Sequence, residues 1–308
     1  MSKEVSIVSS TYRSVADTKA FVESVQKNTK VPYELIMAVN GPVDEDLAQY
    51  AKFLELRGDA KILWNPDNIG VRSFGQVMHL ANTDFIFRCD SDIVIQEEDW
   101  TTKMIDQLTV SNQELGGVAA VGTSNTHGHM IRRSPHTIEV DKIMSNCMLI
   151  WEPAVREISA KLLTELPRMS EYYHKKLAAK SEGYEGELGD LEATLRYAAY
   201  HAPYWDVHFG GLNEALGYGS DDIWWSILAR WAGLKLVTSD TRVFHKDASA
   251  RPEYKEERHR LVSRGFQYLR TSLSLIMDEW RQEKWMELPN NLPVLVEYRN
   301  SGEQLTRR

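Results

Sequence analysis

Four short apolar segments alternate with segments of helical periodicity between Val5 and Cys89, and this alternation constrains the fold more than any other feature. We expect strands at residues 5–8, 35–39, 61–64 and 84–89, and helices at residues 14–28, 44–56 and 71–80. Ser14, with Asp17 three residues later, is typical of a helix start. The pattern predicts an α/β fold with a mostly parallel central sheet flanked by helices.

The composition is that of a folded domain. The 308 residues are 43% hydrophobic and 26% charged, with 36 basic and 44 acidic residues and a net charge of −8. These values exclude a disordered chain and a disulfide scaffold, and the acidic excess argues against a protein that coats nucleic acid.

We expect Cys89 and Cys147 to be reduced core thiols, because both lie in apolar runs. No apolar stretch approaches ~18 residues and no secretory signal is apparent, so we expect a cytoplasmic protein without a transmembrane helix.

Polar residues follow each of the four expected strands. Ligands bind to sheets of this kind beyond the carboxyl ends of the strands, so we expect the four loops to converge on one crevice. Neither Gly-x-Gly-x-x-Gly nor Gly-Lys-Ser/Thr is present, which excludes a dinucleotide-binding loop and a P-loop. The residues that we assign to the crevice are Ser10, Thr11, Tyr12, Arg13, Asn40, Gly41, Asn68, Gly70, Arg72, Asp90, Ser91 and Asp92.

Asp90-Ser91-Asp92 indicates a metal site. Two carboxylates at the end of an apolar strand cannot both keep their charge there without a cation. Their hard oxygens suit Mn²⁺ or Mg²⁺, which take further oxygens from a diphosphate. A second Asp-x-Asp, Asp44-Glu45-Asp46, lies at an expected helix start, where acids favour the positive end of the helix dipole, so we assign it to capping.

The motifs, in this order, resemble family 2 glycosyltransferases with the GT-A fold. Thr11-Tyr12 is similar to the pair that ends the first strand in that family, Asn68-Ile69-Gly70 to an Asn-x-Gly segment before a helix, and Asp90-Ser91-Asp92 to the Asp-x-Asp motif. The resemblance implies that Asn40-Gly41 touches the nucleobase, that Asp90 supports the nucleotide and that Asp92 ligates the metal. Arg13 and Arg72 could hold phosphate by paired hydrogen bonds or form surface ion pairs, and both interpretations stay open.

The second half of the chain carries motifs of the same family. Gly210-Gly211-Leu212-Asn213-Glu214 resembles its Gly-Gly-Phe-Asp-Glu, and Asp221-Asp222 precedes a helix that ends at Gly233. Counting back from Gly233 aligns Asp222 with the catalytic Asp of the family. An alignment shifted by one residue would place Asp221 there instead.

Aromatic residues and one histidine complete the expected site. The resemblance implies that His245, after an expected strand at 241–244, is a third metal ligand, and a hydrogen-bonded structural histidine is the alternative. We expect Trp205 and Tyr218 to contact the sugar or the acceptor, because aromatic faces suit sugar rings. The resemblance of the Gly-Gly segment implies that Gly211 contacts the sugar or the acceptor as well.

We expect a catalytic domain over residues 1–250 and a helical extension and tail over residues 251–308. The catalytic domain divides into a nucleotide-sugar half, 1–125, and an acceptor half, 126–250. A helical insertion at about 152–201, whose first helix we expect to end before Pro167, forms either a lid over the acceptor or a contact in a homo-oligomer.

The resemblance implies a metal-dependent, inverting glycosyltransferase. It would move a sugar from a nucleoside diphosphate sugar, with a UDP-sugar favoured, to an acceptor hydroxyl, with Asp222 as general base. The acceptor stays open among a glycan, a lipid, a small molecule, a protein and a modified nucleic-acid base. The alternatives are a nucleotidyltransferase acting on a sugar phosphate, which usually needs a Gly-rich basic loop that residues 9–12 lack, and a non-catalytic nucleotide-sugar-binding module.

Overall fold

The computed structural model describes residues 4–41, 43–123, 129–144, 146–179 and 221–246, together with Glu279. The segments predicted at 180–201, most of the extension from 251 and the aromatic residues Trp205 and Tyr218 lie outside the described residues. Among the described helices, none is both long and apolar enough to cross a membrane.

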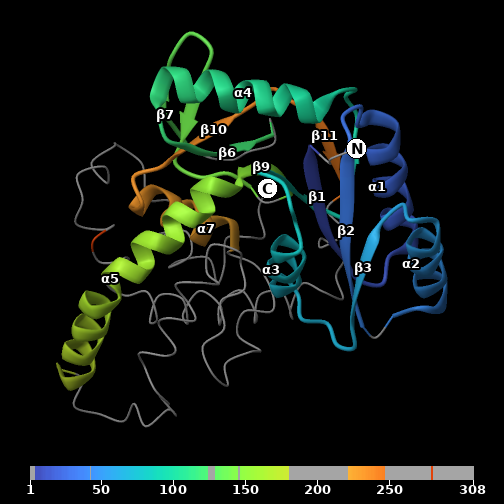
Figure 1. The fold of residues 1–308 in the computed structure, drawn as a ribbon, viewed down its shortest axis with the longest axis horizontal. Helices are drawn as coiled ribbons and strands as arrows, with labels where there is room; N and C mark the ends of the chain where they lie inside the picture. The colour runs from blue at the N-terminus through green and yellow to red at the C-terminus, as the bar shows by residue number, and fades with distance from the viewer. Residues whose placement is uncertain are drawn as a thin grey trace, which may run out of the picture.

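Nine strands form one central sheet. Their bounds are β1 Val5–Thr11, β2 Tyr33–Asn40, β3 Lys61–Asn65, β4 Phe85–Asp90, β6 Val118–Gly122, β7 Met130–Arg133, β8 Ile138–Val140, β9 Cys147–Trp151 and β10 Lys235–Thr238. The strand order is β3-β2-β1-β4-β9-β6-β10-β8-β7 (Figure 1). Strands β3, β2, β1 and β4 are parallel, β9 is antiparallel to both β4 and β6, and β10 is parallel to β6. β8 is antiparallel to both β10 and β7, so seven of the nine strands point the same way and only β8 and β9 of this sheet run against them. In this sense the sheet is mostly parallel, as the alternating pattern predicts.

Helices cover both faces of the sheet. Their bounds are α1 Val15–Asn28, α2 Glu45–Arg57, α3 Arg72–His79, α4 Trp100–Leu115, α5 Glu152–Ala179 and α7 Asp221–Trp231. Successive strand residues point to opposite faces, so Ile7 packs in the cluster with α1 and α4 while Val8 packs in the cluster with α3, α5 and α7 (Figure 1). Burial on both faces explains why β1, β2 and β4 read as continuous apolar runs, whereas the edge strand β3 is partly exposed.

The prediction that the first insertion helix ends before Pro167 was wrong, because α5 continues through that residue. An internal proline removes one backbone hydrogen bond and costs about 3 kcal/mol. Leu162, Leu166 and Met169 are buried in the core around it. Burial of apolar side chains on both sides of the proline offsets the local cost, and this tertiary effect is not visible in the local sequence.

Cys89 and Cys147 are free and buried, as predicted. They stand directly opposite each other on β4 and β9, with their sulfur atoms 3.8 Å apart. Burial, reinforced by the neighbouring thiol, raises the pKa of Cys89 well above its usual value. Cys89 is therefore held as a neutral core thiol, and Cys147 is a free thiol buried opposite it.

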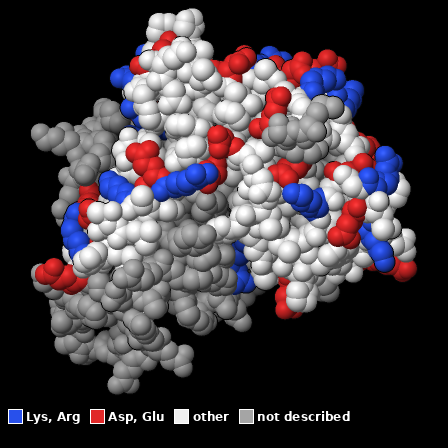
Figure 2. All heavy atoms as spheres, in the orientation of Figure 1, with Lys and Arg blue, Asp and Glu red and all other residues white. Residues whose placement is uncertain are grey.

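Charges of both signs are interspersed on the face of the molecule drawn in Figure 2. Over the described part of that face, no continuous basic patch is visible.

The turn after β2 depends on a close backbone approach at Gly41. Its N–H donates to the carbonyl oxygen of Asn65 at 2.9 Å, and a β-carbon at this position would lie 2.3 Å from the carbonyl oxygen of Pro66. Only glycine therefore lets the loops after β2 and β3 approach this closely.

We expect Gly41→Ala to lower the free energy of unfolding by roughly 3 kcal/mol, the upper end of the usual cost of overpacking. Gly58→Ala is the control, because a β-carbon added to Gly58 would meet nothing within 4 Å and its φ is +72°. The cost at Gly58 is therefore backbone strain alone, about 1 kcal/mol. Urea unfolding measures both, and equal losses would contradict the close approach at Gly41.

Candidate functional site

The carboxyl ends of the four parallel strands lie side by side, as predicted from the alternation. Ser10 at the end of β1 stands opposite Asp90 at the end of β4, and Asn40 at the end of β2 stands opposite Asn65 at the end of β3. The loops that follow these residues share one edge of the sheet. This edge is where a ligand of such a sheet binds.

The buried side-chain amide of Asn40, on β2, bonds to three other elements at this edge. The Asn40 side chain is 2% exposed, donates to the hydroxyls of Ser10 at 3.0 Å and Ser73 at 3.2 Å, and accepts from Asn65 at 2.9 Å. The two serine hydroxyls also bond to each other at 2.6 Å. This network ties β1, β2, β3 and α3 together, and the predicted contact of Asn40 with a nucleobase stays a prediction.

The residues after β1 divide between the core and the surface. Thr11 is buried and shares a hydrogen bond of 2.6 Å with Thr18 of α1, so its hydroxyl serves the packing of that helix. Arg13 is exposed, has a φ of +60° and places its guanidinium 4.8 Å from the centre of the Tyr12 ring. Tyr12 and Arg13 therefore form a stacked pair directly after β1, and both remain candidates for donor binding.

The Asn-x-Gly segment builds the start of α3. The Asn68 side chain accepts from the N–H of Gly70 at 3.0 Å, and Gly70 has a φ of +59°. Arg72 donates from Nε to the carbonyl of Ile69 at 3.2 Å. The motif thus has a structural cause, because a side-chain-bonded turn with a left-handed glycine leads the chain into the helix.

Asp90, Asp92 and His245 form a cluster that we call the metal cluster. Their candidate ligand atoms all lie within 4.8 Å of one another, and His245 Nε2 lies 3.2 Å from an Asp92 carboxylate oxygen. All three side chains are half-buried, and Ser91 lies between the two acids. Two carboxylates and an imidazole are a donor set that Mn²⁺ accepts, and Mg²⁺ would use mainly the oxygens.

A small two-stranded sheet brings His245 to the acids. β5, Ile93–Ile95, follows directly after Asp92, and β11, Val243–His245, pairs with it in antiparallel register so that His245 stands opposite Ile93. The N–H of Lys246 extends the pairing by donating to the carbonyl of Asp92 at 3.0 Å. The register of this ribbon therefore decides which side chain of β11 meets Asp92.

Arg88 is a site residue that the sequence analysis missed. It lies on β4, is 2% exposed, and forms an ion pair of 2.9 Å with an Asp90 carboxylate oxygen. Its guanidinium carbon lies 3.9 Å from the centre of the Phe74 ring of α3. The sequence feature that could have identified it is an isolated arginine inside an apolar strand. A buried guanidinium needs an anion beside it, so a nearby carboxylate is expected. Asp90 is therefore shared between Arg88 and the metal cluster.

The predicted catalytic pair begins α7. Asp222 lies in the first turn, is half-buried, and its carbonyl accepts from the hydroxyl of Ser226 at 2.7 Å. Asp221 is the first residue of the same helix, and its side chain is not among those described. Trp205, Gly211 and Tyr218 lie wholly outside the described residues.

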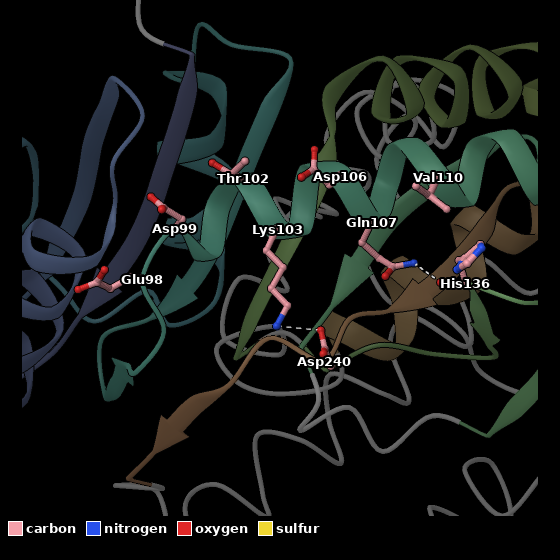
Figure 3. A pocket seen from close by; sticks show the side chains of 9 residues that line it. All are labelled: Glu98, Asp99, Thr102, Lys103, Asp106, Gln107, Val110, His136 and Asp240. Carbon is pink, nitrogen blue, oxygen red and sulfur yellow. Dashed lines mark hydrogen bonds and ion pairs between the residues drawn. The ribbon is translucent and has the colours of Figure 1, made fainter.

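A hollow of about 590 Å³ lies along α4, and none of the residues of the metal cluster lines it (Figure 3). Lys103 Nζ lies 2.9 Å from a carboxylate oxygen of Asp240, and both residues line the hollow. The hydrogen bond from Lys103 lowers the pKa of the Asp240 carboxyl. The residues that line it are Glu98, Asp99, Thr102, Lys103, Asp106, Gln107, Val110, His136 and Asp240. It contains none of the residues assigned to the donor.

Two solved structures resemble this fold. One is S. aureus TarS, at 12% identity and a TM-score of 0.44, where the match covers 84% of this chain and 39% of that one. The other is GalNAc-T7 with UDP, GalNAc and Mn²⁺, at 12% identity and a TM-score of 0.50, covering 79% of this chain and 44% of that one. The chain thus spans about two fifths of the length of these proteins. No curated protein matches it.

The family model for glycosyl transferase family 2 matches residues 6–161. This range runs from β1 into α5, covers half of the chain, and includes Asp90 and Asp92 of the metal cluster. The likeness to GalNAc-T7 supports the GT-A fold that the motif order implied. The chain therefore belongs to glycosyl transferase family 2 and folds as a GT-A glycosyltransferase domain.

Proposed function

We propose that the chain is a metal-dependent, inverting glycosyltransferase that moves a sugar from a nucleoside diphosphate sugar to an acceptor hydroxyl. The observation that carries this proposal is the metal cluster at the carboxyl edge of β4 in a family 2 chain. The solved GalNAc-T7 structure holds UDP and Mn²⁺, which supports a UDP-sugar and Mn²⁺ here. Family membership favours sugar transfer over nucleotidyl transfer. The acceptor stays open among the classes given above.

Asp92 and His245 are the direct ligands in this proposal. Their ligand atoms already lie 3.2 Å apart, so one ion can contact both with little movement. When bound, a divalent cation neutralises the charge that develops on the leaving diphosphate. Its positive charge also offsets the repulsion between the carboxylates of Asp90 and Asp92.

Asp90 has a different task, because Arg88 holds one of its oxygens. The ion pair with the buried guanidinium fixes the carboxylate in one orientation. A carboxylate fixed in this way can accept hydrogen bonds from the nucleotide as well as face the metal. We therefore propose that Asp90 positions the donor, with Arg88 holding it from the core side.

Asp222 acts as the general base. An acceptor hydroxyl is a poor nucleophile at neutral pH, and a carboxylate that removes its proton contributes typically ~10²–10⁴-fold. A base on the face opposite the leaving diphosphate gives inversion at the anomeric carbon. Asp221 is the alternative, one residue earlier in the same helix.

The first test is a thermal-shift panel of UDP and other nucleoside diphosphates, each with and without Mn²⁺. A ligand at a hundredfold excess over Kd should stabilise the chain by about 2.7 kcal/mol. We expect a shift for UDP that requires the metal. The absence of a shift with every diphosphate would contradict the proposed donor site.

Asp222→Asn should reduce sugar transfer by ~10²–10⁴-fold and leave the Kd for UDP and Mn²⁺ unchanged, because the amide cannot take the proton. Transfer is measured as release of UDP from the donor with an active acceptor, and Asp106→Asn, on the exposed side of α4, is the control. If Asp221→Asn loses transfer while Asp222→Asn stays fully active, the general base is Asp221.

Asp90→Asn and Asp92→Asn should differ in stability when no metal is present. Asp90→Asn leaves the buried Arg88 without its carboxylate and should lower the free energy of unfolding by roughly 1–3 kcal/mol. Asp92→Asn removes one of two neighbouring negative charges and should cost less, while it weakens Mn²⁺ binding. Urea unfolding in EDTA gives the comparison, and an equal loss in both variants would contradict the role given to Arg88.

A further inference from the structure

We propose that Lys246 is a positioning residue for the metal cluster, and that it acts by anchoring the end of β11 to the first turn of α1. The inference rests on the proposed function, since it concerns how His245 is held beside Asp92. It assigns a role to an ion pair, Lys246 with Asp17, that joins two parts of the chain far apart in sequence.

The ribbon that carries His245 is small. β5 and β11 have three residues each and form a two-stranded sheet of their own. A two-stranded pair of this length is marginally stable by itself in water. The position of the imidazole relative to Asp92 must therefore be fixed by what the ribbon packs on.

Helix α1 supplies that support at both ends of the ribbon. Near the end of α1, the Asn28 side chain donates to the carbonyl of Ile95 at 2.8 Å, and the Ser24 hydroxyl accepts from the N–H of Ile95 at 3.0 Å. These bonds hold β5. At the start of α1, Asp17 accepts from Lys246 Nζ at 2.8 Å, and this bond holds the strand that carries His245.

The carboxylate that receives Lys246 is itself held in place. The Ser14 hydroxyl, at the N-cap of α1, donates to the other oxygen of Asp17, and the Asp17 N–H donates back to Ser14 at 3.4 Å. The side chain of Asp17 is 11% exposed and that of Lys246 is 32% exposed, so water screens the pair only in part. An acid in the first turn also benefits from the helix dipole.

Lys246 therefore has two bonds that act together. Its backbone N–H donates to the carbonyl of Asp92, and its ammonium group donates to Asp17. The first fixes the register of the ribbon next to the metal cluster, and the second fixes the ribbon on the helix. Partners that orient metal ligands from outside the coordination sphere typically change metal affinity 10–100-fold when they are mutated.

The test measures the Kd for Mn²⁺ at saturating UDP, from the spin-resonance signal of free Mn²⁺, in the full-length chain. We expect Lys246→Met and Asp17→Asn each to raise this Kd about tenfold. The double variant should be no weaker than either single variant, since both remove one interaction. Lys246→Arg should restore most of the affinity.

Lys61→Met is the matched control. Lys61 of β3 forms an ion pair of 2.6 Å with the largely buried Glu34, so the same substitution removes a lysine–carboxylate pair at another place in the sheet. Its Kd for Mn²⁺ should equal that of the wild type. Thermal unfolding of all variants checks that each one folds.

The outcomes separate this inference from the proposed function. A wild-type chain that binds no Mn²⁺ with UDP would overturn both. A wild-type chain that binds Mn²⁺, with an unchanged Kd in Lys246→Met, would overturn the positioning role alone. The positioning role would also be overturned if Lys246→Met weakened Mn²⁺ binding while Asp17→Asn bound Mn²⁺ like the wild type. The ammonium group of Lys246 would then act on the diphosphate directly.

Discussion

The antiparallel pairing of β5 with β11 is the constraint on which the metal cluster depends. Asp90 and Asp92 are near each other for a local reason, since they follow one strand. His245 comes from the far end of the domain and reaches them only because β11 aligns with β5 in one register. A slip of one residue would turn the imidazole to the other face of the ribbon and bring Phe244 or Lys246 in its place.

The charges at this edge of the sheet are arranged around the same constraint. A buried arginine faces Asp90 from the core side, and a lysine beside His245 is directed to α1. Each cation is thus bound to a specific carboxylate, Arg88 to Asp90 and Lys246 to Asp17. Two neighbouring half-buried acids repel each other, and the ion pair of Asp90 with Arg88 limits that cost.

Local patterns were enough to predict the first seven elements and to place Asp90-Ser91-Asp92 at the end of a strand, while metal binding there stays a prediction. The strands are apolar on both faces, the turns carry glycine and asparagine, and Asp90-Ser91-Asp92 ends a strand, so each signal lies within a few residues of what it predicts. His245 was identified through family resemblance, and its place in the cluster agrees with that identification. Arg88 and the Lys246–Asp17 pair were not predicted, because their meaning depends on partners in other elements. The continuation of α5 through Pro167 was missed for the same reason, since the core that offsets the proline is assembled from distant residues.

The order of strands in the sheet also implies an order of assembly. β3, β2, β1 and β4 pair among themselves, so this block can form once the chain has been made as far as Asp90. β9 then enters between β4 and β6, although β6 precedes it in the chain, and β10 enters between β6 and β8. The second half of the sheet therefore stays open on the ribosome until the chain beyond α7 emerges. Pairings between such distant segments are slow to form, and the edge of β6, which waits for β10, is the place where a nascent chain of this kind would need protection.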